Sequence, residues 1–338
     1  MKKRIISLIL AVVLIFGISC VGAFAKEDVT EVSIDNIYKL TYDNNPNIVV
    51  LSNNIFILGM AGLSNAELAA NASTITSLTV SKKQIAYGAQ QLLLSYYKLL
   101  NTRDTLKINA AYLDESLKVS KVMYETGMMT YIDYISLLNS KTELESNLIT
   151  LESNISQIET SLKTMINLSS EDQMKIADFS PLDSGIIDTL DREACYAQAV
   201  QNSYTLRSNF ETLYDADMNY YVAESDMTEK QRDNAVISYR TAKTAVSNTF
   251  DNQWTDLALK RDALKLAQTK VELAKTTYEL DKVRMETGTI SKIDLVKSEN
   301  AYKTAQIDLE NAQIDFTTAY KKFEALLAGV ELSSSAAA

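Results

Sequence analysis

Carboxyl groups are the only side chains of this sequence that are numerous enough to suggest acid–base chemistry. The 338 residues include 43 Asp and Glu, 33 Lys and Arg, 2 Cys and no His. Without His, the usual general base, the Ser-His-Asp arrangement and most zinc sites are excluded. The sequence contains no Gly-rich phosphate loop, and acidic pairs on Glu- and Lys-rich helices are usually solvated faces. The sequence therefore predicts a protein that is not an enzyme and holds no cofactor and no metal.

Two stretches of the chain nearly repeat each other. They read YETGMMTYIDYISLL, residues 124–138, and METGTISKIDLVKSE, residues 285–299. Gly127 and Gly288 stand where a helix can end in a left-handed residue, which Gly adopts at little steric cost. Each stretch is therefore predicted to be the short turn of an antiparallel helical hairpin.

The residues after each Gly suit the start of the next helix. A Thr or Ser three positions on can cap that helix, and an Asp at its third position can complete a capping box. The two pairs are Thr130 with Asp133 and Ser291 with Asp294. Turn chemistry alone explains these residues. It does not explain the apolar Met129 and Ile290 at a tip predicted to be exposed, or the presence of two copies.

Helices are predicted for the rest of the chain. Nine Gly and two Pro leave few interruptions, and apolar residues from 144 to 165 recur every three or four positions, as in one continuous seam. Residues 257–285 carry two seven-residue repeats, one beginning at Leu257 and one at Leu259. These repeats lie about 200° apart on a helix. They fit either a helix inside a bundle or a helix in a curved wall with a neighbour on each side.

The similarity between the two halves extends beyond the turns. Residues 33–48 resemble residues 190–206, and a polar segment with Pro181 lies between the halves. The predicted fold class is all-α, with two tandem half-repeats of long antiparallel helical hairpins. The predicted boundaries are 26–168 for the first half-repeat, 169–190 for a linker, 191–329 for the second half-repeat and 330–338 for a disordered tail.

The N-terminus is typical of an exported protein. Basic residues at 2–4 precede an apolar run at 5–18, and Ala23 and Ala25 fit a signal peptidase site. Cleavage of the predicted signal peptide, residues 1–25, would remove three basic and no acidic residues and change the formal net charge from −10 to −13. Such an acidic chain is a poor partner for nucleic acid or for an anionic membrane surface.

The two cysteines have different expected fates. Cys20 would leave with the signal peptide, so only Cys195 would remain and no internal disulfide could form. The alternative is lipidation at Cys20. GISC, residues 17–20, is a poor lipidation motif because Gly replaces the usual aliphatic residue.

Together these features resemble the TolC-type outer membrane efflux proteins. The resemblance rests on DNNP at 43–46, the two Gly-x-apolar-Ser/Thr-x-x-Asp turns, the Ala- and Leu-rich seams after them, and LLAG at 326–329. Proteins of that family form homotrimers in which twelve helical strands make a hollow α-barrel, while short strands build a β-barrel through the outer membrane. Their paired turns close the periplasmic end and meet an adaptor protein.

The resemblance implies an exit-duct component of a tripartite efflux or secretion system. The implied partners are two further copies of the chain, an adaptor (membrane fusion) protein and an inner-membrane transporter, and the implied location is the outer membrane or periplasm, or the surface of a cell without an outer membrane. It also implies adaptor binding at both turns, which should lie close together at the same end, and a constriction at two aspartates. The implied tip residues are Gly127, Met129, Thr130, Gly288, Ile290 and Ser291, with Asp133 and Asp294 at the constriction. A second acidic ring is not expected, because its position falls at Lys297.

The sequence departs from that family where the membrane strands are expected. Two membrane-crossing strands and their turn need roughly 25 residues in each half. From Pro46 to Gly127, and over the matching span of the second half, about 80 residues are available, and a leading helix of ~20 residues with a long descending helix uses them all. Little or no β-barrel is therefore expected, with reversals near Gly62 and Asp226 instead.

Two segments of the first half could differ from the rest, and one rival function is open. The β-branched run at 73–80 is the only candidate strand remnant, and residues 48–63 are apolar enough to touch lipid, although a buried face between helices is the stronger prediction. The rival to an exit duct is an exported coiled-coil structural or scaffold protein of the cell envelope that has lost the channel role.

Overall fold

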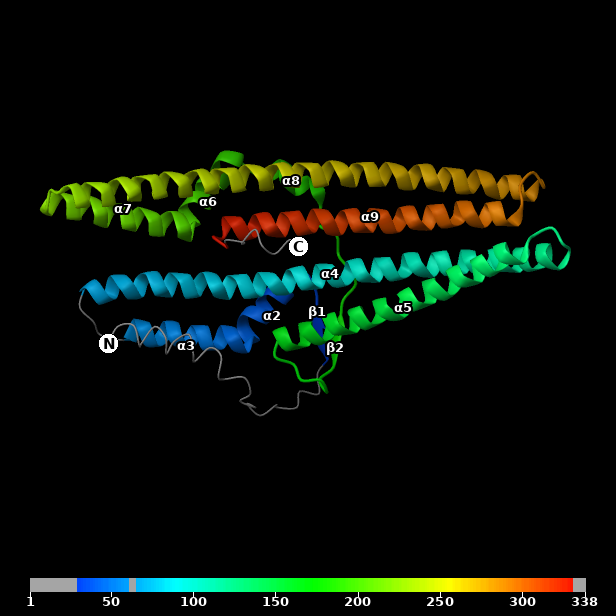
Figure 1. The fold of residues 1–338 in the computed structure, drawn as a ribbon, viewed down its shortest axis with the longest axis horizontal. Helices are drawn as coiled ribbons and strands as arrows, with labels where there is room; N and C mark the ends of the chain where they lie inside the picture. The colour runs from blue at the N-terminus through cyan, green and yellow to red at the C-terminus, as the bar shows by residue number, and fades with distance from the viewer. Residues whose placement is uncertain (1–28, 61–64, 331–338) are drawn as a thin grey trace.

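The computed structural model describes residues 29–60 and 65–330, and helices dominate them (Figure 1). The first half contains β1 (Thr30–Val32), α2 (Ile37–Asn44), α3 (Pro46–Met60), α4 (Asn65–Glu125) and α5 (Tyr131–Met165). Next come β2 (Met174–Ile176) and η1 (Ser184–Thr189). The second half contains α6 (Arg192–Asn202), α7 (Tyr204–Val222), α8 (Asp226–Glu286) and α9 (Lys292–Leu327). The prediction of an all-α fold with two half-repeats is confirmed.

The helices of the two halves match in order and in length. Helices α4 and α8 each have 61 residues, and α5 and α9 have 35 and 36. At 1.5 Å per residue, α4 and α8 are each about 92 Å long. The short pairs α2–α3 and α6–α7 precede them. The predicted leading and descending helices are therefore present in both halves.

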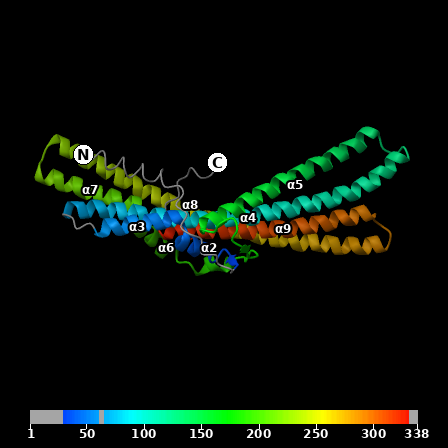
Figure 2. The same cartoon turned by 90° about the horizontal axis from the view of Figure 1, so that it is seen from below.

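The long helices form one row. Helix α4 packs on α5, α8 packs on α9, and α4 and α9 join the two hairpins, which gives the order α5, α4, α9, α8 (Figure 1). Helices α3 and α7 lie beside the starts of α4 and α8, at the end opposite the turns. The view in Figure 2 shows the α4–α5 and α8–α9 hairpins diverging toward their turns.

Each hairpin has its own apolar core. The α8–α9 core is built around the fully buried Phe250, Phe316 and Phe323, which pack with Leu257. The rings of Phe250 and Phe323 lie 5.7 Å apart. In the α4–α5 core the predicted seam of α5 faces α4, and Leu162 is fully buried. The seam predictions for α5 and for one side of α8 are therefore confirmed.

Two three-residue strands tie the first half to the connecting segment. β1 and β2 pair in parallel, with Thr30 opposite Met174 and Val32 opposite Ile176. Val32 is fully buried against the α4–α5 core. The sequence analysis missed both strands, because three residues are too few to show an alternating pattern.

The candidate strand remnant at 73–80 is helical, so that prediction is wrong. The segment lies inside α4. Its hydroxyl groups bond within the helix: Thr76 Oγ1 donates to the Ala72 carbonyl at 2.9 Å, and Thr79 Oγ1 donates to the Ile75 carbonyl at 2.8 Å. β-branched residues are only slightly unfavourable in a helix, and packing on neighbouring helices outweighs that preference.

The chain reverses between α7 and α8, as predicted near Asp226. Helix α7 ends at Val222 and α8 begins at Asp226. The break contains no Gly, and Ser225 caps α8 with a capping box in which Thr228 N donates to Ser225 Oγ at 3.3 Å. In the first half, the predicted reversal at Gly62 falls on residues 61–64, outside the described residues, between the neighbouring helices α3 and α4.

Several predictions concern the ends of the chain. The signal peptide and Cys20 fall within residues 1–28, outside the described part, as does the tail from 331. Val330, the last described residue, is buried. No helix within 29–60 or 65–330 is both long enough and apolar enough to cross a membrane.

Candidate functional site

The first turn has the geometry of a helix end followed at once by a capped helix. Gly127 has φ +76°, the left-handed conformation that its position was predicted to require. The Met128 amide donates to the Met123 carbonyl at 2.7 Å and so satisfies a carbonyl at the end of α4. Thr130 caps α5: the Asp133 amide donates to Thr130 Oγ1 at 3.2 Å, and that hydroxyl donates to Asp133 Oδ2 at 2.7 Å.

The second turn repeats this geometry. Gly288 has φ +70°, and the Thr289 amide donates to the Arg284 carbonyl at 2.8 Å. Ser291 and Asp294 form the full capping box: the Asp294 amide donates to Ser291 Oγ at 3.3 Å, and the Ser291 amide donates to Asp294 Oδ2 at 3.2 Å. Hydrogen bonds from the Ser291 hydroxyl and amide lower the pKa of the Asp294 carboxyl.

The left-handed glycines allow a matched pair of substitutions. Gly127→Ala is expected to destabilise the protein by roughly 1–2 kcal/mol, because an L-residue is strained at this φ. The new Cβ would meet nothing within 4 Å, so the effect comes from the backbone alone. Gly88→Ala, inside α4 and equally free of contacts, is expected to stabilise by about 0.5–1 kcal/mol. Urea unfolding measures both, and equal effects of the two substitutions would contradict the assignment.

The capping box gives a pH-dependent prediction. The pKa of Asp294 is lowered in the folded protein. The ionised carboxylate therefore contributes its full stabilisation above the unfolded pKa of about 3.9, and this stabilisation is lost as the pH falls through the lower folded pKa. Ser291→Ala is expected to raise the pKa of Asp294 toward its ordinary value, as measured by an NMR titration of the carboxyl carbon. Ser298→Ala is the control, since its hydroxyl bonds to Leu295. An unchanged pKa in Ser291→Ala would contradict this account.

The apolar residues at the tips are placed differently from the prediction. Met129 and Ile290 were expected to be exposed, and both are half-buried. The exposed residues of the first tip are Met128, at 75 %, and Ile132, at 79 %. The counterpart of Met128 is Thr289, so the first tip is the more apolar of the two. The side chain directly after each left-handed Gly points to solvent, and the next one lies back on the hairpin.

Aromatic rings stiffen the first tip. Tyr124, near the end of α4, stacks on Tyr134 of α5 with 5.5 Å between ring centroids, and it also contacts Tyr131 at 5.7 Å. These contacts join the last turn of one helix to the first turns of the next. Sequence reasoning did not single out these tyrosines, although their positions beside a predicted turn were visible.

Both turns lie at the same end of the molecule, as predicted (Figure 1). They do not lie close together, because the hairpins that carry them diverge toward this end (Figure 2). An ion pair links the two hairpins close to them: Lys292 Nζ, in the first turn of α9, lies 2.8 Å from Glu115 Oε1 of α4. Glu115 also pairs with Lys118 of its own helix at 2.9 Å. Hydrogen bonds from Lys292 and Lys118 lower the pKa of Glu115 to about 2.

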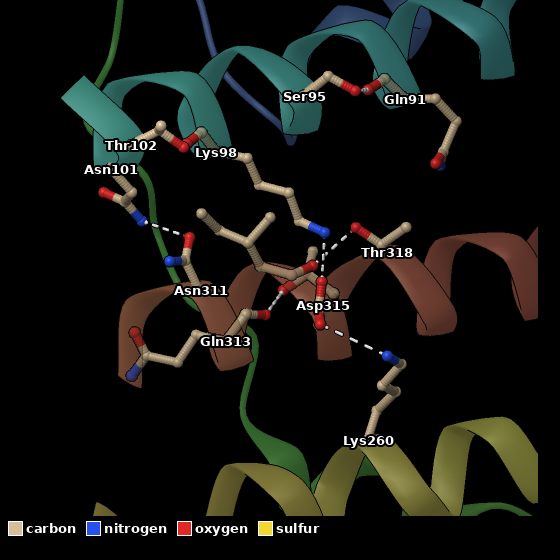
Figure 3. A network of polar contacts seen from close by, with 12 residues as sticks. Gln91, Ser95, Lys98, Asn101, Thr102, Lys260, Asn311, Gln313, Asp315 and Thr318 are labelled. Atoms are coloured by element: carbon tan, nitrogen blue, oxygen red, sulfur yellow. Dashed lines mark hydrogen bonds and ion pairs between the residues drawn. The ribbon is translucent and has the colours of Figure 1, made fainter. Parts of the chain in front are cut away.

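A second polar link lies midway along the hairpins (Figure 3). Asp315 of α9 is paired with Lys98 of α4 and, at 3.4 Å, with Lys260 of α8. Asn101 Nδ2 donates to Asn311 Oδ1 at 3.0 Å beside it. One carboxylate thus contacts both neighbouring helices.

The described residues offer little for catalysis. Within 29–60 and 65–330, no group of three His, Cys, Asp or Glu side chains is arranged to hold a metal ion. Cys195 is buried, and burial raises the pKa of its thiol, which makes it a poor nucleophile at neutral pH.

The arrangement of helices and turns was compared with known proteins. No family model and no curated protein matches the sequence. The structure matches the channel protein CusC with a TM-score of 0.62 and 11 % identity, over 88 % of this chain and 97 % of that one. It matches the outer membrane channel CmeC of Campylobacter jejuni with a TM-score of 0.55 and 10 % identity, over 93 % and 92 % of the two chains. It matches the outer membrane protein VceC of Vibrio cholerae with a TM-score of 0.54 and 11 % identity, over 88 % of this chain and 97 % of that one.

This chain has the fold of the TolC-type outer membrane channels. At 10 to 11 % identity the likeness shows the fold alone. In this TolC-type fold the paired turns form one end of the row of helices, and α3 and α7 form the other (Figure 1).

Proposed function

We propose that this chain is the exit-duct component of a tripartite efflux or secretion system in the cell envelope. It would provide a path for transport and carry out no catalysis. The observation that carries the proposal is the pair of matched turns at one end of a TolC-type fold. A spacer needs long helices, but it has no need for two matched, capped tips at the same end.

Ring closure is supported by the outer edge of α8. Leu266, at 57 % exposure, and Leu273, at 68 %, belong to the predicted second seam of α8, and no other helix of the described chain covers them. The whole exposed seam is Leu259, Leu266, Leu273 and Leu280. Because α8 and α5 are the two outer helices of the row, this edge would meet α5 of the next copy. We propose that three copies close into a ring.

The tips are the proposed adaptor-binding surface. Met128 and Ile132 would provide the apolar contact, since they are the most exposed large apolar side chains of the turns. The backbone that presents this surface is shaped by the residues assigned from the sequence, Gly127, Met129, Thr130, Gly288, Ile290 and Ser291. Asp294 completes the capping box of α9, and Asp133 accepts a hydrogen bond from the Thr130 hydroxyl at the start of α5. Their exposed carboxylates would line the entrance.

The link between Lys292 and Glu115 is proposed to hold the entrance closed. Glu115→Gln is expected to increase hydrogen exchange in the first turn of α9 at neutral pH, with little change in overall stability because solvent screens the pair. Lys118→Gln removes only the ion pair within α4 and should leave that exchange unchanged. If Lys118→Gln has the larger effect, Lys292 does not hold the two hairpins together.

Transport tests the proposal directly. Cells that lack the chain are expected to retain a compound or protein that they otherwise export, and the intact chain should restore export. A chain with Met128→Asp and Ile132→Asp should be produced and fail to restore it. If no exported compound or protein accumulates without the chain, the structural or scaffold role is the better account.

A further inference from the structure

Helix α3 exposes an apolar face at the end opposite the turns. Only Ile48 of this helix is buried. Phe56, Ile57 and Met60 are 67 %, 63 % and 70 % exposed, and Val49 and Val50 are about half exposed. At about 100° per residue, these five side chains lie within about 120° of the helix circumference. A contiguous exposed patch of large apolar residues marks a surface that is covered by something else.

The charge distribution around α3 argues for a lipid rather than a protein. Residues 44–81 contain one charged residue, Glu67, whereas the matching residues 202–239 of the second half contain ten. The two halves share their helix order, and α4 and α8 have the same length, so the architecture does not require the difference in charge. A hairpin almost free of charge suits contact with the apolar part of a bilayer.

Side chains suited to a membrane interface stand where the charge-free stretch ends. Lys82 Nζ lies 4.6 Å from the ring centroid of Tyr42, and Tyr42 stacks on Tyr38 at 6.1 Å. Tyr and Lys favour the headgroup region of a bilayer, where an apolar body and a polar tip are both accommodated. From Pro46 to Met60, α3 extends about 22 Å beyond this group.

A second copy of the chain fits this face poorly. The exposed leucines of α8 recur every seven residues from Leu259 onward. The same spacing continues along this ridge toward the start of α8, next to α7, but the residues there are polar or small. Its exposed residues at this end are Gln231, Ser238, Ala245 and Asn252. The leucines that would meet a neighbouring copy therefore stop before the level of α3. The charged α7–α8 hairpin of the same chain also diverges from α3 and α4 at this end (Figure 2).

We propose that the exposed face of α3 docks on a lipid bilayer, with Phe56, Ile57 and Met60 in its apolar part and Tyr42 and Lys82 among the headgroups. Zwitterionic lipid is the expected ligand, because the chain has a net charge of −10 and the docking face has no basic cluster. Binding should therefore depend little on salt. This surface is separate from the tips and does not depend on their proposed role.

Flotation with phosphatidylcholine vesicles tests the proposal. The chain is purified after export, so that the predicted signal peptide is absent. The unaltered chain is expected to float with the vesicles at both 0.1 M and about 0.5 M salt. Phe56→Asp with Ile57→Asp should lower the partition coefficient at least about tenfold. The matched control is Phe210→Asp with Tyr214→Asp on α7. This helix also exposes large apolar side chains, but the exposed Glu211, Asp215 and Asp217 lie among them, so this variant should retain binding.

A fluorescent label on the otherwise unaltered chain tests the same contact without a charge that could disturb folding. Phe56→Cys or Tyr221→Cys is labelled with an environment-sensitive nitrobenzoxadiazole, while Cys195 is buried and reacts little. Emission from position 56 should shift to the blue with vesicles, and emission from position 221 should not. An unaltered chain that does not bind vesicles would overturn the proposal. So would vesicle binding that is unchanged in Phe56→Asp with Ile57→Asp while light scattering shows a smaller assembly, since a second copy would then cover α3.

Discussion

Leu266→Asp combined with Leu273→Asp is expected to convert the assembled protein into monomers. In the proposed ring each copy buries both leucines against the next copy. Withdrawing two leucines from a contact costs roughly 3–6 kcal/mol, and a buried unpaired carboxylate adds to that cost. Each interface should therefore weaken by at least about a hundredfold. Light scattering at micromolar concentration measures the change from trimer to monomer.

The polar end of the same ridge supplies the control. Ala245→Asp with Asn252→Asp introduces the same charge on the same helix, at positions that are also exposed. This variant is expected to remain assembled, and circular dichroism should show equal helix content in both variants. An unaltered chain that is a stable monomer at micromolar concentration would contradict ring closure.

Met128→Asp combined with Ile132→Asp is expected to abolish cross-linking to the adaptor. These side chains are 75 % and 79 % exposed and make the first tip apolar. In the proposed complex they are buried, so two carboxylates would have to be desolvated without partners, which costs several kcal/mol. The readout is the yield of a covalent adduct from a photoreactive residue placed at Thr289 of the neighbouring tip.

Ile149→Asp is the matched control for the tip. Ile149 is 73 % exposed on the same helix, about 25 Å from Ile132 along α5. It should leave the adduct unchanged. If the tip variant gives the same yield of adduct as the control, the turn was duplicated for architecture and not for docking.

Local chemistry made much of this fold predictable. A left-handed Gly, a hydroxyl cap and an Asp lie within seven residues of one another, so both turns could be predicted without knowing the rest of the fold. The two seams of α8 follow from spacing alone, because a seven-residue repeat shifted by two positions must occupy the opposite side of a helix. The buried Leu257 and the exposed Leu259 confirm that the two seams differ in environment.

Pairings between residues far apart in the chain could not be predicted from the sequence. Thr30 pairs with Met174, and Lys98 pairs with Asp315, yet nothing local marks either partner. The exposure of Met128 rather than Met129 was also missed. It depends on the direction of the backbone after a left-handed residue, and spacing along a helix does not describe that direction.

The contrast between α3 and α7 shows a further limit of repeat-based reasoning. The two helices occupy corresponding places in their half-repeats, and the structure confirms the correspondence. Their surfaces nevertheless differ in charge, since α3 has no charged residue and α7 has four. Function assigned to one half therefore has to be argued again for the other.

Electron micrographs of the assembled protein viewed along its helices test the central claim most directly. An exit duct built from this fold should appear as a hollow ring with threefold symmetry and an opening at its centre. The tip variant should keep that ring, and Leu266→Asp with Leu273→Asp should lose it. Solid bundles, or separate rods of one chain each, would contradict the exit duct and favour a structural protein of the envelope.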